Sequence, residues 1–191
     1  GLVTRRTDVR AFPTDVVATS EPYAFAFDRF QETTVDVGWP LAALATSRDG
    51  RWLFCLTPLD WGWVRAGDIA FGPRQAVAAY VQAEPFAVIM ASRALVSLGG
   101  GGGVTPQMGT RLPVEAQDER ACRLRIPVRS SEGTLAYAQG FVARAGDQCQ
   151  VGYLPCTLRT VFTGAFALLG EPYAWGCSGG TARASSATCT P

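Results

Sequence analysis

The stretch "SRDGRWLFCLT", residues 47–57, combines a tight-turn signal with an alternating apolar run. Asp49 and Gly50 separate two apolar segments, and an Asp-Gly pair in this position is typical of a β-hairpin turn. After the turn, the side chains of residues 52–57 alternate between two unlike faces, as they do in a strand. Residues 47–57 therefore predict a hairpin in a small β-domain.

Another turn and a short strand follow in residues 60–70, "DWGWVRAGDIA". The strand is expected over residues 63–65, and Gly67 marks the next tight turn. Three short strands joined by tight turns indicate a small β-barrel. A second set of strand patterns predicts a second small barrel, and it covers residues 85–91, 122–130, 134–145 and 149–155.

Five consecutive glycines, residues 99–103, interrupt this second set. A phosphate-binding loop needs Gly-Lys-Ser/Thr before a helix, and the chain contains no lysine. We therefore expect residues 97–109 to form a flexible loop rather than a nucleotide site.

One long helix is predicted near the end of the chain. Thr157 is a suitable N-cap, Gly170 a suitable C-terminal cap, and Pro172 prevents the helix from continuing. The apolar residues between these points recur with helical spacing, at Leu158, Val161, Phe162, Ala165, Phe166 and Leu169. After Cys177 the chain has only small residues, one arginine and a proline, and we expect this tail to be disordered.

Composition limits the chemistry that these residues can perform. Of the 191 residues, 48% are hydrophobic and 17% charged, which is sufficient for a packed core. The net charge of +1 gives no reason to expect nucleic acid as a partner. The chain contains no histidine, so a His-based catalytic triad and a His-containing zinc site are excluded within it. We expect no metal and no cofactor.

Six cysteines occur, and none of them forms a C-x-x-C pair that would indicate a zinc ribbon or a thioredoxin-like motif. They fit buried free thiols, and disulfides stay open if the protein is exported. No apolar run is long enough to predict a transmembrane segment. The first residue is Gly1 and no signal peptide is present, which fits a mature form or a fragment.

Several stretches resemble multidomain cell-wall cysteine peptidases of the NlpC/p60 type, in which bacterial SH3-like barrels precede a papain-like peptidase domain. The stretches are "RAFPTD" (10–15), "FDRFQET" (27–33), "SRDGRWLF" (47–54), "GWV" (62–64), "MGTRLPV" (108–114), "GYLPCT" (152–157) and "AFALLGEPYAWG" (165–176). The last is the most specific, because the family's motif there reads A-F-x-x-L-G-x-P-Y-x-W-G-G, followed by a short loop and D-C-S.

The resemblance implies a mainly β protein with two small SH3-like β-barrels, one C-terminal α-helix and a disordered tail. Residues 1–36 would form an N-terminal clip, residues 37–75 the first barrel and residues 76–156 the second. Residues 157–176 would hold the first helix and the P-Y-x-W-G segment of a truncated peptidase domain. Residues 177–191 form a divergent tail, which fits a reading frame interrupted just after Gly176.

The family's catalytic pair is absent from these residues. Cys177 replaces the second glycine of the motif, no D-C-S follows, and no histidine is present. Tyr173 matches the tyrosine that, in the family, helps to polarise the attacked carbonyl. Cys177 is the catalytic candidate nearest to the motif, and Cys189 lies at the very end, but neither stands where the family's nucleophile does. We therefore name no catalytic nucleophile.

The resemblance points to the SH3-like targeting portion of a peptidoglycan (γ-D-glutamyl-diamino acid) endopeptidase that is catalytically silent as it stands. The alternative is a stand-alone cell-wall binding module with no hydrolytic role. The partners would be peptidoglycan or muropeptide stem peptides, in the cell envelope or periplasm. Exposed aromatic and acidic side chains are what such a ligand needs, so the candidate ligand-binding residues are Asp60, Trp61, Asp68 and Tyr137, with Tyr153 beside them. A proline-rich peptide binder is a weaker alternative, since no dense acidic loop is present.

Overall fold

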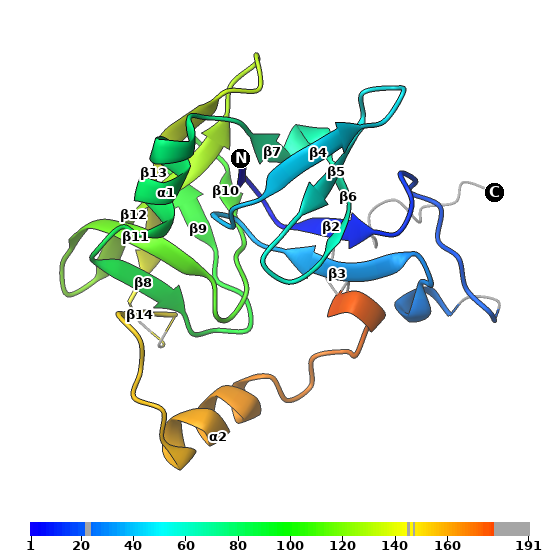
Figure 1. Ribbon diagram of the computed structural model, residues 1–191. Coiled ribbons are helices and arrows are strands. Elements are labelled where there is room, and N and C mark those ends of the chain that lie inside the picture. The colour runs from blue at the N-terminus through cyan, green and yellow to red at the C-terminus, as the bar shows by residue number, and fades with distance from the viewer. Residues whose placement is uncertain (22–23, 145, 147, 178–191) are drawn as a thin grey trace.

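A computed structural model describes residues 1–21, 24–144, 146 and 148–177. The prediction of a mainly β architecture is confirmed. Figure 1 shows two lobes side by side: the first contains β1 to β7, and the second contains α1 and β8 to β14. The predicted disordered tail after Cys177 lies outside the described residues.

The first lobe is built on a five-stranded antiparallel sheet of order β3-β2-β6-β5-β4. Its strands are β2 (Thr7–Arg10), β3 (Gln31–Val35), β4 (Ala42–Thr46), β5 (Trp52–Leu56) and β6 (Trp61–Arg65). The predicted hairpin is the β4–β5 turn, where Gly50 has a φ of 69° that favours glycine and the backbone N–H of Arg51 donates to Asp49 Oδ1. Residues 7–10 and 31–35 thus belong to the same sheet as this hairpin.

The second lobe contains a seven-stranded antiparallel sheet of order β10-β9-β13-β12-β11-β8-β14. Its strands are β8 (Phe86–Ile89), β9 (Val96–Leu98), β10 (Gly103–Val104), β11 (Arg111–Gln117), β12 (Ala121–Arg129), β13 (Leu135–Ala143) and β14 (Cys149–Val151). The region 97–109, expected to be a flexible loop, therefore holds β10 and the end of β9, because Gly103 and Val104 pair with Ser97 and Val96.

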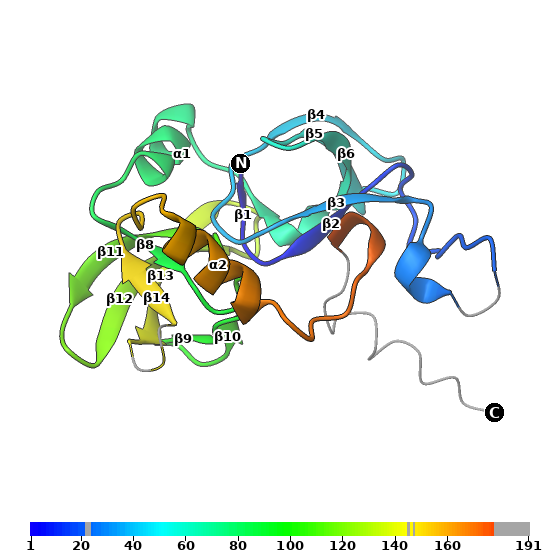
Figure 2. The same ribbon diagram turned by 90° about the horizontal axis from the view of Figure 1, so that it is seen from below.

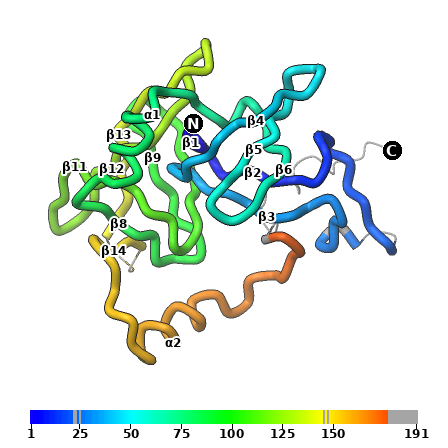
Figure 3. The backbone as a smooth tube through the Cα atoms, viewed as in Figure 1, coloured from blue at the N-terminus to red at the C-terminus, as the bar shows by residue number. Residues whose placement is uncertain are grey.

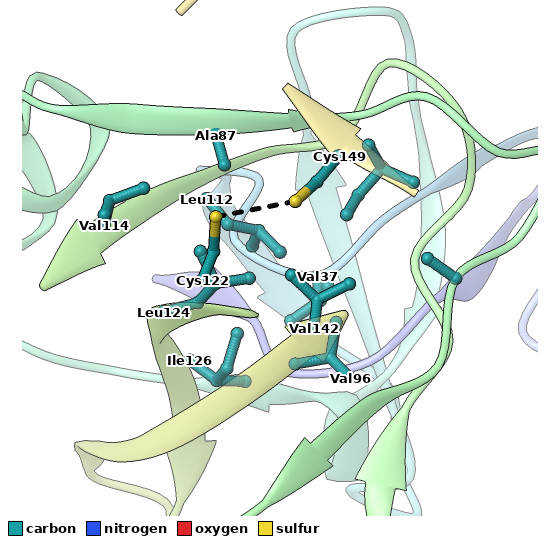
Figure 4. Close-up of a cluster of buried hydrophobic side chains, with 12 residues drawn as sticks. Val37, Ala87, Val96, Leu112, Val114, Cys122, Leu124, Ile126, Val142 and Cys149 are labelled. Atoms are coloured by element: carbon teal, nitrogen blue, oxygen red, sulfur yellow. Dashed lines mark hydrogen bonds between the residues drawn. The ribbon is translucent and has the colours of Figure 1, made fainter. Parts of the chain in front are cut away.

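Both sheets curl around apolar cores. Among the described residues neither sheet closes into a complete barrel, so each of the two predicted barrels has free edges. Figure 4 shows the core of the second lobe, to which β8, β9 and β11 to β14 all contribute. In the sheet, β11 and β8 separate β12 from β14, yet Cys122 and Cys149 on these two strands meet across the core. The seven-stranded sheet is therefore strongly curled.

Short pairings and one buried valine join the lobes. Within the first lobe, β1 (Leu2–Val3) pairs with β7 (Ile69–Ala70). Phe71, directly after β7, exchanges backbone hydrogen bonds with residues 133 and 135 of the second lobe. Val37, which follows β3, is completely buried in the core of the second lobe. The first lobe thus contributes Val37 to the core of the second lobe, and backbone hydrogen bonds at Phe71 also connect the two lobes.

The structure contains a helix that the sequence pattern did not predict. α1 (Arg74–Val81) precedes β8 and buries Tyr80. The predicted C-terminal helix is α2 (Leu158–Ala167), and Thr157 caps it by accepting from the backbone N–H of Thr160. Among the described residues, no helix is both long and apolar enough to cross a membrane.

The chain runs from the second lobe back to the first after β14. Figures 2 and 3 show it passing through α2 and reaching a short 3₁₀ turn, η4 (Trp175–Cys177), beside β3. None of the residues of α2 is buried, and its apolar side chains at positions 158, 162 and 166 are exposed. The apolar face that the sequence predicted is therefore present, but nothing in the described residues covers it.

Candidate binding groove

A groove of about 300 Å³ lies where the two lobes meet. The apolar part of its wall comes from both lobes and from the segment after β14, and it includes Trp39, Pro40, Pro58, Tyr80, Pro113 and Tyr153. Arg111 on β11 is its charged group. An apolar cavity with one charged group is the usual composition of a small-ligand site, because apolar walls supply contact area and the polar group fixes orientation.

Arg111 is held in place by three contacts. Its guanidinium lies 3.8 Å from the ring centroid of Phe86, and Nη2 donates to the backbone oxygen of Ala83 at 3.0 Å and to Glu84 Oε1 at 3.2 Å. No described residue accepts a hydrogen bond from Nε or Nη1. A preorganised guanidinium with free N–H groups is suited to binding a carboxylate.

Tyr153 forms an exposed edge of the groove. It directly follows Gly152 at the end of β14, its side chain is 70% exposed, and its ring packs on Phe86 with a centroid distance of 4.7 Å. Phe86 therefore supports both Arg111 and Tyr153. An exposed ring next to a fixed guanidinium gives a ligand an apolar contact beside a charged one.

Tyr137, one of the predicted ligand-binding residues, lies behind the groove wall. Its ring stacks on Tyr80 at 5.6 Å with an interplanar angle of 4°, and the hydroxyl of Tyr80 donates to the backbone oxygen of Arg125. Burial raises the pKa of both tyrosines above the ordinary range, so both remain neutral hydrogen-bonding groups. Tyr137 thus supports the groove through Tyr80.

Of the other three predicted ligand-binding residues, two lie together on the surface and the third is buried. Asp60 and Trp61 are adjacent and exposed at the start of β6, where Trp61 is 66% exposed and its backbone N–H donates to Asp60 Oδ1 at 2.8 Å. Pro58, in the same turn, lines the groove. Asp68 is buried, and its carboxylate pairs with Arg5.

A second surface surrounds Tyr173, the residue that matches the family's active-site tyrosine. Tyr173 is 69% exposed, and its ring centroid lies 6.0 Å from that of Phe27. Glu171 pairs with Arg93 of the second lobe at 3.5 Å, and η4 packs on β3. Cys177 is the last residue of η4, and Cys189 lies beyond the part of the chain that is described.

Four cysteines are described as free thiols, of which Cys55, Cys122 and Cys149 are buried and Cys156 is exposed. Burial raises the pKa of the Cys55 thiol to about 11 and that of Cys149 to about 12. These thiols are protonated at neutral pH and are therefore poor nucleophiles. Within the described ranges, no group of three or more His, Cys, Asp or Glu side chains could hold a metal ion.

Comparison with known families identifies part of the first lobe. Residues 20–65 match the model of the SH3 domain of the SH3b1 type. This part of the chain is an SH3-like domain. It extends from before η1 (Phe25–Phe27) to the end of β6, and its strands β4 and β5 form the hairpin predicted from residues 47–57. No curated protein matches the chain.

Two solved structures share the fold over 92% of this chain. One is an NlpC/P60 endopeptidase from Photobacterium damselae subsp. piscicida, with a TM-score of 0.74 and 20% identity. The other is an NlpC/P60 family protein from Bacillus cereus ATCC 10987, with a TM-score of 0.70 and 14% identity. This chain spans 38% of the first protein and 65% of the second. At these identities the likeness concerns the fold.

Proposed function

We propose that these residues are the cell-wall targeting portion of a peptidoglycan endopeptidase of the NlpC/P60 type, and that the groove between the lobes binds the peptide stems of the wall. Three observations support this function. Residues 20–65 match an SH3b1-type domain, both similar structures are named as NlpC/P60 proteins, and the groove offers the chemistry such a ligand requires. The groove carries the proposal. The location would be the cell envelope or periplasm.

The chemistry of a muropeptide stem fits the groove. A stem peptide alternates carboxylates with small apolar side chains, so it needs a cation beside an apolar surface. Arg111 supplies free N–H donors for a carboxylate, while Trp39 and Tyr153 supply apolar contact. A volume of about 300 Å³ is at the small end of ligand sites, which suits two or three residues of a stem.

The division of the chain into modules is part of the same proposal. The proposed targeting units are residues 37–75 and 76–156, and residues 1–36 are the proposed clip. The strands β2 and β3 of the clip complete the sheet of the first lobe, and the SH3b1 match begins inside the clip, at residue 20. Residues 157–176 correspond to the start of a peptidase domain, followed by the divergent tail 177–191. The exposed apolar face of α2 supports this, because such a face is suited to packing inside a further domain.

Residues 1–191 are proposed to be catalytically silent. Hydrolysis of a γ-D-glutamyl bond by a cysteine peptidase needs a thiolate and a base that accepts its proton. No histidine is present to act as that base. Without a nucleophile there is no attacked carbonyl for Tyr173 to polarise. Its contact with Phe27 is then a packing contact. The alternative of a stand-alone binding module would leave the exposed face of α2 and the P-Y-x-W-G segment without a purpose.

Sedimentation with purified peptidoglycan sacculi tests the binding proposal. Arg111→Gln should weaken binding about tenfold or more, because a charge-assisted hydrogen bond contributes about 1.5–3 kcal/mol. Tyr153→Ala should also weaken binding, because it removes the exposed ring that gives the ligand its apolar contact. Arg48→Gln, in the exposed β4–β5 turn, is the matched control and should bind like the wild type. Trp61→Ala tests the predicted contact on the β5–β6 turn separately. Failure of the wild type to sediment, or full binding by Arg111→Gln, would overturn the role of the groove.

Digestion of muropeptides tests catalytic silence. Chromatography of the products should show no release by residues 1–191. Product release that disappears in Cys177→Ala or Tyr173→Phe would show that these residues do catalyse, and would refute silence while leaving the groove proposal intact.

A further inference from the structure

Two cysteines of the second lobe lie next to each other as free thiols, in a position that suits a disulfide bond. Cys122 on β12 and Cys149 on β14 lie 27 residues apart in sequence, and their Sγ atoms are 3.6 Å apart inside the core. Figure 4 shows the two sulfurs pointing at each other, with apolar side chains around them. A disulfide has an S–S length of about 2.0 Å, so the two sulfur atoms must approach each other further for the bond to form.

We infer that Cys122 and Cys149 form a structural disulfide when the protein folds in an oxidising compartment. In the folded protein, Cys55 and Cys156 lie apart from this pair. Cys55 is buried in the core of the first lobe, and Cys156 is exposed after the strand. This inference rests on the geometry of the second lobe alone, and it stands or falls separately from the proposed function.

The oxidation balances with a low-molecular-weight disulfide such as glutathione disulfide as the oxidant. One cysteine thiolate attacks a sulfur of glutathione disulfide and releases glutathione, which leaves a mixed disulfide on the protein. The second cysteine then attacks the protein sulfur of that mixed disulfide and releases a second glutathione. The two cysteines lose two protons and two electrons in total, and the glutathione disulfide takes them up.

The bond must form while the chain folds rather than afterwards. Both thiols are buried, and burial together with the neighbouring thiol raises the pKa of Cys149. A buried and protonated thiol reacts slowly, because the thiolate is the attacking species and the oxidant must reach it. The same burial would protect the finished bond from reductants.

The disulfide would fix the edge of the curled sheet. β14 is a three-residue edge strand that pairs only with β8 among the described strands, and Tyr153 of the groove follows directly after it. Linking β14 to β12 crosses the two strands that lie between them in the sheet. The bond therefore restrains the strand that positions one edge of the groove.

Peptide mapping of the full chain tests the inference. The protein is unfolded in reductant, refolded with a glutathione redox pair, alkylated and digested with trypsin. Cleavage after arginine leaves Cys122 in residues 121–123, and Cys149 together with Cys156 in residues 145–159. The variant Cys156→Ser removes this ambiguity. We expect these two peptides to be linked, with the loss of two hydrogen masses, in both the wild type and Cys156→Ser.

Thermal unfolding gives a second readout. Closing a loop of this length should raise Tm by about 10 °C in protein refolded with glutathione disulfide relative to reduced protein. Cys149→Ala should remove the difference between the two preparations, whereas Cys156→Ser should keep it. Unlinked peptides in refolded Cys156→Ser protein would overturn the inference, and so would a link that joins either cysteine to Cys55. The peptide map decides the matter even if Cys149→Ala does not fold.

Discussion

Replacing Asp28 with alanine should destabilise the protein more than any surface substitution. Arg10 and Asp28 are 1% and 0% exposed, and Arg10 Nη1 lies 2.8 Å from Asp28 Oδ2. Asp28 Oδ1 also accepts hydrogen bonds from the backbone N–H groups of Ala18 and Phe30. The alanine variant would leave a buried guanidinium without its carboxylate and two N–H groups without an acceptor. Breaking one partner of a buried pair costs about 3–5 kcal/mol.

Urea unfolding followed by tryptophan fluorescence measures this loss. About 3–5 kcal/mol is a large part of the total stability of a typical domain, and corresponds to a fall in Tm of about 6–20 °C. Asp15→Ala is the matched control, because Asp15 is half-exposed and pairs with Arg65 at the surface, where a pair contributes about 0–1 kcal/mol. If Asp28→Ala cost no more than Asp15→Ala, the argument from burial would be refuted.

A double substitution separates the charge from the packing. Arg10→Met with Asp28→Leu removes both charges and keeps most of the apolar volume, and such replacements of buried ion pairs are often neutral or stabilising. We expect the double variant to recover most of the stability that Asp28→Ala loses. The remaining deficit would come from the two N–H groups that lose Asp28 and from the two oxygens that lose the guanidinium of Arg10, which are Val16 O and Gln31 Oε1. A double variant as unstable as Asp28→Ala would show that the loop after β2 depends on hydrogen bonds more than on charge pairing.

Further substitutions test the packing and the buried thiol. Gly140→Ala places a Cβ 2.5 Å from Ile126 Cγ1 in the core and should cost about 1–3 kcal/mol in urea unfolding. At Gly164 on α2 an added Cβ would lie in open space, so Gly164→Ala should raise the free energy of unfolding by about 0.5–1 kcal/mol. A lower free energy of unfolding would contradict the assignment of this segment as a helix. The pKa of the Cys55 thiol is about 11 in the folded protein and about 8.5 in an unfolded chain. The unfolded chain therefore releases this proton first as the pH rises, and the free energy of unfolding should fall between about pH 8.5 and 11, less steeply in Cys55→Ala.

The parts of the fold that the sequence predicts are those set by local pattern. The hairpin at Asp49-Gly50, the alternation along β12 and the capped helix after Thr157 all depend on residues close together in the chain, and all three are present. α1 was missed because its apolar residues cover little more than two turns and Pro73 precedes it, so the segment resembles a loop. Gly103 and Val104 were assigned to a loop because a two-residue strand has no alternation to detect.

The groove could not be predicted, because its residues come from distant segments. Trp39 follows β3, Arg111 lies on β11 and Tyr153 follows β14. Only the joining of the lobes brings these segments together, and the buried Val37 that helps to join them looks like any other apolar residue in the sequence. The predicted ligand residues were chosen for exposed aromatic or acidic character, a criterion that fits Trp61 but not Asp68, whose partner Arg5 is 63 positions away.

Gly176, in the P-Y-x-W-G segment, has a structural role that does not depend on catalysis. Gly176 has a φ of 61°, which side-chain-bearing residues rarely adopt, and a Cβ there would lie 2.6 Å from Gln31 Cγ and 3.0 Å from the backbone oxygen of Glu32. Glycine at this position lets η4 lie directly against β3 of the SH3-like domain. The chain leaves the second lobe after β14 and is fastened to the first lobe at this contact, with α2 between the two attachments. The P-Y-x-W-G segment would therefore also fix where the proposed peptidase domain lies relative to the SH3-like sheet.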